Sequence, residues 1–345
     1  MFDMHPLKLI SRTFMKRNVG EKKLWDACSE GNVVLVQELI KKKNINLNWK
    51  DETHKRTPLY RACYFNHLEI IEILLKEKRV RVNSAQCEGA TPFLLACQKG
   101  EPRILQLLLD DKRIDVTRAD NLERTGFFVA CEIGNIEAVK LLLKDNRIDF
   151  NKPKNDGTTP FSVACETGQI EVVKLLLNDP RIDIQKDDKY GISPFYISCQ
   201  KNHFEIVNLL LKNPIIDVNK GDCWDATPFF ISCERGHIEI VKLLLSSDRQ
   251  VDIHKIWKAG NRDAYCQAKI NSTSSTFARE RSESQAKTRQ SNCSKIVELI
   301  EAYQKDQQWT RHQLQKELGI LINAASNMFS LIVLLDDDYF KLKSF

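Results

Sequence analysis

Cysteine recurs at an almost constant spacing in this chain of 345 residues. Seven of the eleven cysteines form one column, with a first step of 35 residues and five further steps of 34. The column consists of Cys28, Cys63, Cys97, Cys131, Cys165, Cys199 and Cys233. Thiols repeated in this way could pair as disulfides, hold metal ions or act in redox chemistry. Which of these is feasible depends on the elements that position them.

A hydroxyl residue recurs with the same period and is followed by proline in five of six copies. The hydroxyl column consists of Thr57, Thr91, Thr125, Thr159, Ser193 and Thr227, and Gly126 replaces the proline once. A hydroxyl side chain caps the first free N–H groups of a helix, and proline is tolerated at the next position. Each copy therefore predicts the start of a helix.

Glycine or asparagine stands three residues after every cysteine of the column. These two residue types enter the left-handed conformation at the end of a helix most easily. The pattern predicts a short first helix, a tight turn and a second helix such as Ile238–Leu245, which is apolar on nearly all sides and needs cover from neighbours. Alternating apolar residues, as in Arg113–Val116, then indicate an extended finger, with a reverse turn such as Asp156-Gly157.

These repeats resemble the ankyrin-repeat family, whose unit of about 33 residues has a Thr-Pro-Leu-His-x-Ala motif. The motif reads TPLYRAC, TPFLLAC, TPFSVAC, SPFYISC and TPFFISC in this sequence, and GHIEIVKLLL follows the last copy. The histidine of the motif is replaced in every copy, which puts its hydrogen bonds between repeats in question. The resemblance implies an all-α solenoid: an ankyrin-repeat array of helix-turn-helix units with β-hairpin-like fingers, closed by a helical C-terminal cap.

We expect four segments along the chain. They are a basic leader at 1–21, an array of seven units at 22–255, a degenerate repeat at 256–305 interrupted by a polar insertion at 271–292, and a helical cap at 306–345. The insertion has few apolar residues, so we expect it to be disordered. In the cap, Thr310 and Gln313 form a capping-box pattern at a helix start. The apolar stretch Met328–Leu335 is expected to close the stack or, alternatively, to dock a partner helix.

The net charge of +6 is concentrated at the N-terminus, since residues 1–25 contribute six Lys/Arg and two acids. The body is nearly neutral, so no nucleic-acid partner is expected. A tether to nucleic acid or acidic membranes through the leader is a weaker alternative. The sequence has no secretory signal and no apolar run of about 20 residues, so we expect no membrane insertion. The expected location is cytoplasmic, with the nucleus left open, and the cysteines are expected to be thiols.

The cysteine column falls where the family usually has a small alanine on the packed side of the first helix. Stacked helices lie about 8–10 Å apart, whereas disulfides need Cα atoms within about 4.4–6.8 Å. The column also lacks the paired C-x₂₋₄-C spacing of zinc sites. Packing is therefore the favoured interpretation, and a thiol-based redox or metal-buffering protein is the alternative. Cys87 and Cys223 are expected at finger tips and accessible.

No glycine-rich phosphate loop, nucleophile elbow or metalloprotease motif occurs, so we expect neither an enzyme nor a cofactor or metal site. The resemblance implies a monomeric scaffold or adaptor that binds a protein partner along the concave face of the array. In the family, contact residues lie just before each Thr-Pro and just after the column position. The aromatic, apolar and basic candidates in these places are Arg56, Tyr64, Phe65, Leu122, Arg124, Lys189, Tyr190, Trp224 and Arg235.

Overall fold

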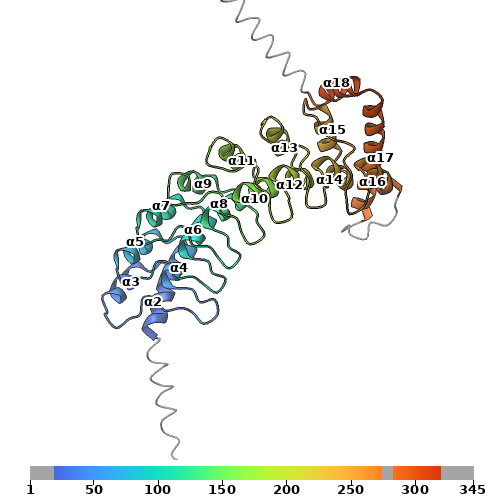
Figure 1. The fold of residues 1–345 in the computed structure, drawn as a ribbon. Coiled ribbons are helices and arrows are strands. Elements are labelled where there is room, and N and C mark those ends of the chain that lie inside the picture. The colour runs from blue at the N-terminus through green and yellow to red at the C-terminus, as the bar shows by residue number, and fades with distance from the viewer. Residues whose placement is uncertain (1–18, 274–282, 320–345) are drawn as a thin grey trace, which may run out of the picture. The chain divides into compact units, whose positions relative to one another are not determined.

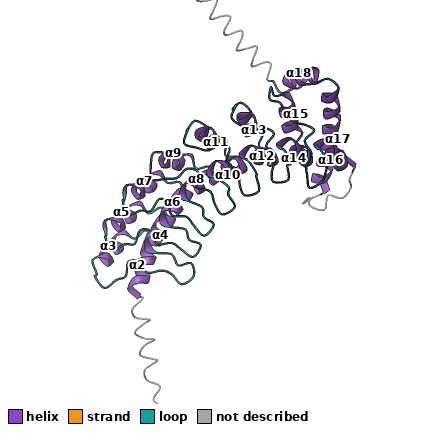
Figure 2. Cartoon of the chain, viewed as in Figure 1, coloured by secondary structure: helices purple, strands orange, loops and turns teal. Residues whose placement is uncertain are grey.

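The computed structural model describes residues 19–273 and 283–319, which form helices joined by turns and loops (Figures 1 and 2). The chain divides into two compact units: unit 1 ends at Ile184 and unit 2 begins at Gln185. Each repeat has a first helix, a second helix and a finger, which is the loop that leads to the next first helix. The all-α repeat array expected from the sequence is confirmed.

Five helix pairs make up the described part of unit 1 (Figure 1). The first helices lie side by side in one row and the second helices in another, because each first helix contacts the next. The first helices are α2 (Val19–Glu30), α4 (Pro58–Tyr64), α6 (Pro92–Lys99), α8 (Gly126–Ile133) and α10 (Pro160–Thr167). The second helices are α3 (Val33–Ile40), α5 (Leu68–Lys76), α7 (Pro102–Asp110), α9 (Ile136–Leu142) and α11 (Ile170–Leu177).

The hydroxyl column caps the first helices, as predicted. Thr57, for example, is extended and accepts a hydrogen bond from the backbone N–H of Tyr60 at 3.2 Å. The one glycine in place of proline has a packing reason. A Cβ atom on Gly126 would lie 2.7 Å from the Cys97 Sγ and 3.0 Å from the Phe93 ring, so only glycine fits there.

The fingers are built from consecutive turns, and no strand is assigned in the part of the chain that the structure describes. The apolar alternation in Arg113–Val116 predicts correctly which side chains are buried, since Ile114 and Val116 are both buried. Asp115 makes the backbone turn instead of extending, because its carboxylate accepts hydrogen bonds from the N–H and hydroxyl of Thr117. The hairpin-like shape remains at the tips, where Asp120 N–H donates to the carbonyl of Arg124.

In five fingers an arginine bonds to the end of the second helix of the preceding repeat, and sequence reasoning missed this role. The Arg147 guanidinium donates to the carbonyl of Leu109 at 3.0 Å and pairs with Asp145. These bonds satisfy carbonyl groups that the end of a helix leaves free. The pKa of Asp145 is lowered, chiefly by the hydrogen bond from Arg147. Arginines that make the same kind of bond are Arg79, Arg113, Arg181 and Arg249.

Unit 2 continues the alternation in its described residues and then departs from it (Figure 1). The pairs α12 (Pro194–Gln200) with α13 (Phe204–Leu211) and α14 (Pro228–Arg235) with α15 (Ile238–Ser246) follow the repeat. Helices α16 (Ala264–Thr273) and α17 (Glu283–Lys305) pack together where an eighth unit is expected, and α18 (Gln307–Glu317) packs on α15 and α17.

The polar segment 271–292 was expected to be disordered, but its residues 271–273 and 283–292 are helical. Three of its polar side chains bind the end of α14. The Arg289 guanidinium donates to the carbonyl of Glu234, and Asn292 donates to the carbonyl of Gly236. Asn271 also donates to Glu234 at 2.9 Å. The free carbonyl groups at a helix end can thus accept hydrogen bonds from polar side chains of another helix.

The expected capping box at Thr310 and Gln313 is wrong. Helix α18 begins at Gln307, and the carboxylate of Asp306 caps it by accepting from the Trp309 N–H at 2.9 Å. Thr310 is buried inside the helix. The apolar stretch at 328–335 and residues 1–18 of the leader lie outside the described residues. No helix in the described ranges has the length and apolar content that crossing a bilayer requires.

Candidate functional site

The first finger of unit 1 has a rigid tip that positions Arg56. The Asp51 carboxylate accepts hydrogen bonds from the backbone N–H groups of His54 and Arg56. Burial alone would raise the pKa of Asp51, but these hydrogen bonds lower it overall. Trp25 in α2 donates its indole N–H to the carbonyl of Arg56 at 3.0 Å. The finger tip is therefore tied both to itself and to the first helix of the array.

The Arg61 guanidinium contacts aromatic rings from two neighbouring helices, α2 and the end of α4. Its guanidinium carbon lies 4.3 Å from the centroid of the Trp25 ring and 4.5 Å from that of Phe65. Its Nε also donates to the Ser29 hydroxyl at 2.9 Å. The pKa of Arg61 is lowered, first by burial and then by the nearby charge of Arg56. A cation held over two rings keeps them in one arrangement.

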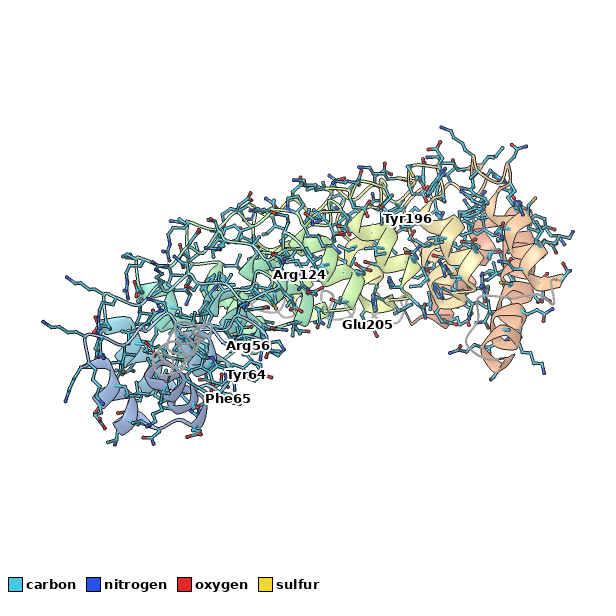
Figure 3. All side chains as sticks on the ribbon, turned by 90° about the horizontal axis from the view of Figure 1, so that it is seen from below. Arg56, Tyr64, Phe65, Arg124, Tyr196 and Glu205 are labelled. Carbon is cyan, nitrogen blue, oxygen red and sulfur yellow. The ribbon has the colours of Figure 1, made fainter. Side chains whose placement is uncertain are left out.

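Tyr64 and Phe65 extend this arrangement towards solvent. Their rings meet edge to face at 5.0 Å, and Arg56 lies 5.5 Å from the Tyr64 centroid. Lys99 of the next repeat places its ammonium 4.4 Å from the same ring. Figure 3 shows Arg56, Tyr64 and Phe65 together at one end of unit 1. We call the set Trp25, Arg56, Arg61, Tyr64 and Phe65 the aromatic–arginine cluster.

A hollow of about 670 Å³ adjoins the cluster. Trp25, Arg56 and Arg61 form part of its wall, together with Trp49 and Lys22. Its acidic residues are Asp51 and Glu52, and Asp51 is already engaged by the finger backbone. The hollow thus offers aromatic surface and three cations, Lys22, Arg56 and Arg61, against two carboxylates. Phe65, which Arg61 contacts, is 43% exposed.

Two aromatic residues project from neighbouring finger tips of unit 2. Tyr190 is 54% exposed and Trp224 is 51% exposed. Asp188 and Asp222 hold the two tips by accepting from the backbone N–H groups of these residues. The tips are linked because Cys223 N–H donates to the carbonyl of Tyr190 at 2.8 Å. We call Tyr190 and Trp224 the tip pair.

The structure groups some of the predicted contact residues and leaves others separate. Arg56, Tyr64 and Phe65 form one group and the tip pair forms another. Leu122 is exposed at a finger tip. The guanidinium of Arg124 is engaged within its own repeat by Asp120 and Glu132. The remaining candidates, which lie at the surface, are Lys189 and Arg235.

Sequence reasoning missed Arg61, although a signal for it was present. Arg61 stands where the later repeats have a buried aliphatic residue in the first helix. The equivalent residues are Leu95, Val129, Val163, Ile197 and Ile231. A basic residue in a core column breaks the local rule of the array, and such breaks tend to mark function. Its spacing from Tyr64 and Phe65 also places all three on one helix face.

All seven column cysteines are buried, as the packing interpretation predicts. Burial raises the pKa of the Cys28 thiol to about 12 and raises that of Cys63 as well. A buried thiol of raised pKa is a poor nucleophile. Cys87 and Cys223 are exposed, as expected. Within the described residues no group of three His, Cys, Asp or Glu side chains could hold a metal ion.

Three ankyrin-repeat segments match this chain, at residues 24–120, 117–188 and 180–255. The chain therefore belongs to the ankyrin-repeat family. Ankyrin repeats are generally protein–protein interaction modules and typically non-enzymatic scaffolds.

Short matches relate the chain to acyl-CoA-binding domain-containing protein 6. The bovine (Bos taurus) protein is 39% identical over 56 residues, 16% of this chain and 20% of that protein. The human (Homo sapiens) protein is 33% identical over 72 residues, 20% of this chain and 25% of that protein. The chain thus spans only a fifth to a quarter of these relatives.

Proposed function

We propose that this chain is a non-catalytic adaptor that docks a protein partner on the aromatic–arginine cluster of unit 1. The observation that supports this is the joint placement of Arg61, Tyr64 and Phe65 beside the 670 Å³ hollow. Tryptophan, tyrosine and arginine dominate the energetic centres of protein interfaces. The cluster lies at the finger and the first-helix end, the places where ankyrin repeats contact partners.

The chemistry of the cluster indicates what the partner presents. The hollow wall has three cations, Lys22, Arg56 and Arg61, and two carboxylates, Asp51 and Glu52, of which Asp51 is engaged by the finger backbone. A carboxylate of the partner would meet these cations, and an apolar side chain would pack against the exposed ring of Phe65. We therefore propose that the partner contributes an acidic segment with at least one large apolar side chain.

The repeat offers a matched pair of variants to test the proposal. Phe65 and Ile133 occupy the same position of the repeat. Phe65 directly follows the last residue of α4, and Ile133 is the last residue of α8. Both are exposed to a similar extent, 43% and 45%. The partner would be identified by photo-crosslinking from residue 65 in cells, and its affinity for purified variants would then be measured.

We expect Phe65→Ala to weaken binding of that partner about 30-fold, the effect of losing an interface centre of about 2 kcal/mol. Ile133→Ala should change the affinity less than about threefold. Thermal unfolding of both variants shows whether the fold is retained. Equal losses in the two variants, or none in Phe65→Ala, would contradict the proposed site.

A further inference from the structure

A second hollow, of about 480 Å³, lies among three successive fingers of unit 1. Lys50 comes from the finger before α4, Arg81 and Ser84 from the finger before α6, and Arg113 and Arg118 from the finger before α8. Four cations thus line the hollow, and its lining includes no carboxylate. Cations gathered from separate repeats raise the local positive potential.

Two of these cations are fixed in the wall. Arg113 pairs with Asp111 and donates to the carbonyl of Leu75, and the Lys50 ammonium donates to the carbonyl of Ala85 at 2.6 Å. The guanidinium groups of the other two, Arg81 and Arg118, hydrogen-bond to no described residue. A guanidinium in this situation presents its planar set of donors to a ligand.

Arg81 departs from the repeat at this place. The fingers that follow have Asp115, Asp149 and Asp183 at the equivalent position, in the sequences RID. Asp149 supports its finger, since its carboxylate accepts from the N–H of Asn151 at 2.9 Å. Arg81 cannot make that bond because its side chain is only a donor. The sequence thus has a base in place of a structural acid at the middle one of the three fingers that line the hollow.

We propose that this hollow binds a ligand that carries two or more phosphate groups. Arg81 and Arg118 would each bind phosphate oxygens in the bidentate manner of guanidinium, and Ser84 would donate its hydroxyl. Lys50 and Arg113 add positive charge from fixed positions. The carboxylate of Asp115 interacts electrostatically with Arg118 and also accepts a hydrogen bond from the Thr117 hydroxyl. The phosphates could belong to a soluble molecule or to a lipid headgroup.

Inorganic tripolyphosphate is the probe for the shared chemistry, titrated calorimetrically at low ionic strength into the full chain. Arg81→Asp gives the finger the residue of its neighbours, so we expect it to fold, and it should weaken binding at least tenfold. Arg118→Gln should weaken binding about threefold to tenfold. Added salt should weaken binding by the wild type, because the contacts are electrostatic.

Matched controls make the same charge changes elsewhere. Arg103→Asp changes an exposed arginine on α7, and Lys152→Gln removes the base equivalent to Arg118 in the next repeat. Both should bind tripolyphosphate within about twofold of the wild type. Absence of binding by the wild type, or equal losses in the controls, would overturn the proposal.

Vesicles of phosphatidylcholine with and without phosphatidylinositol bisphosphate distinguish the two sources. Sedimentation with the bisphosphate vesicles, abolished by Arg81→Asp, would assign the phosphates to a lipid headgroup. Tripolyphosphate binding without such sedimentation would assign them to a soluble ligand.

Discussion

Two cysteine–aromatic pairs in this chain have opposite surroundings. Cys63 precedes Tyr64 at the end of α4, and Cys223 precedes Trp224 at a finger tip. Cys63 is 1% exposed and its pKa is raised by burial, whereas Cys223 is exposed. Tyr64 has cations of Arg56 and Lys99 over its ring, while Trp224 projects into solvent.

The difference shows that the position within a repeat decides the kind of contact surface. A helix end places its aromatic ring against neighbouring repeats, so that the ring is ordered before any partner binds. The tip that carries Trp224 is held by the carboxylate of Asp222 and by the bond from Cys223 to Tyr190, while the Trp224 side chain itself stays exposed. Ordered groups lose less conformational entropy on binding, so the aromatic–arginine cluster should bind more tightly than the tip pair.

Thiol labelling should show the largest contrast between the two pairs. We expect Cys223 to react with a maleimide at least about 100-fold faster than Cys63, because Cys63 reacts only after local opening of the fold and its thiolate is disfavoured. Mass spectrometry of tryptic peptides over time measures both rates. Rapid labelling of Cys63 in the native fold would instead favour the redox hypothesis for the cysteine column.

Arg61→Leu separates binding from stability. Leucine matches the aliphatic residues of the other repeats, such as Leu95, so we expect the unfolding free energy to change by less than about 1 kcal/mol. Partner affinity should fall about 30-fold, since the cation between Trp25 and Phe65 is lost. Urea unfolding and titration with the crosslinked partner check the two quantities. An unaltered affinity would remove Arg61 from the site.

Replacing Tyr190 and Trp224 together by alanine should have a smaller effect. We expect partner affinity to fall about tenfold or less and the unfolding temperature to stay within about 2 °C, because both side chains are solvent-exposed. A loss larger than that of Arg61→Leu would reverse the comparison. The double variant Leu122→Ala with Ile133→Ala is the control for exposed apolar residues outside both groups.

The smallest expected effect is a pH dependence due to His237. Burial lowers the pKa of His237, whose Nε2 lies 3.0 Å from the carbonyl of Gln200. The folded chain favours the neutral ring, and this preference contributes to the free energy of unfolding. The contribution is complete above the ordinary pKa of about 6.5 and is lost as the pH falls through the lower pKa of the folded state.

His237→Gln should remove this dependence and keep the bond between repeats. Gln169 occupies the same position in unit 1 and donates to the carbonyl of Glu132 at 3.3 Å. Unfolding free energies of the wild type and the variant between about pH 5 and 7 should converge at neutral pH and differ by about 1 kcal/mol or less in acid. A pH dependence that persists in the variant would assign it to another group.

The regular helices could be predicted closely, because short-range chemistry sets their limits. The Thr-Pro pairs and the left-handed Gly and Asn residues act within a few positions of the chain. The start of α18 was predicted wrongly for a local reason, since Asp306 is the residue that caps it. The segment 271–292 was predicted wrongly because its contacts come from far away in the sequence. Within α17, Arg289 and Asn292 bind the end of α14, and no local pattern contains that information.

The candidate site could be predicted only in part for the same reason. Arg56, Tyr64 and Phe65 were predicted from the position they occupy in the repeat. Their grouping depends on Trp25 and Arg61, which come together only when α2 packs on α4.

The sequence by itself determined the repeat, its helix boundaries and the burial of the cysteine column, since each follows from local backbone preferences and a repeated apolar pattern. Tertiary structure decided which side chains from different repeats meet. Cation–ring contacts and shared hollows depend on distances across neighbouring units, and a linear pattern does not encode those distances.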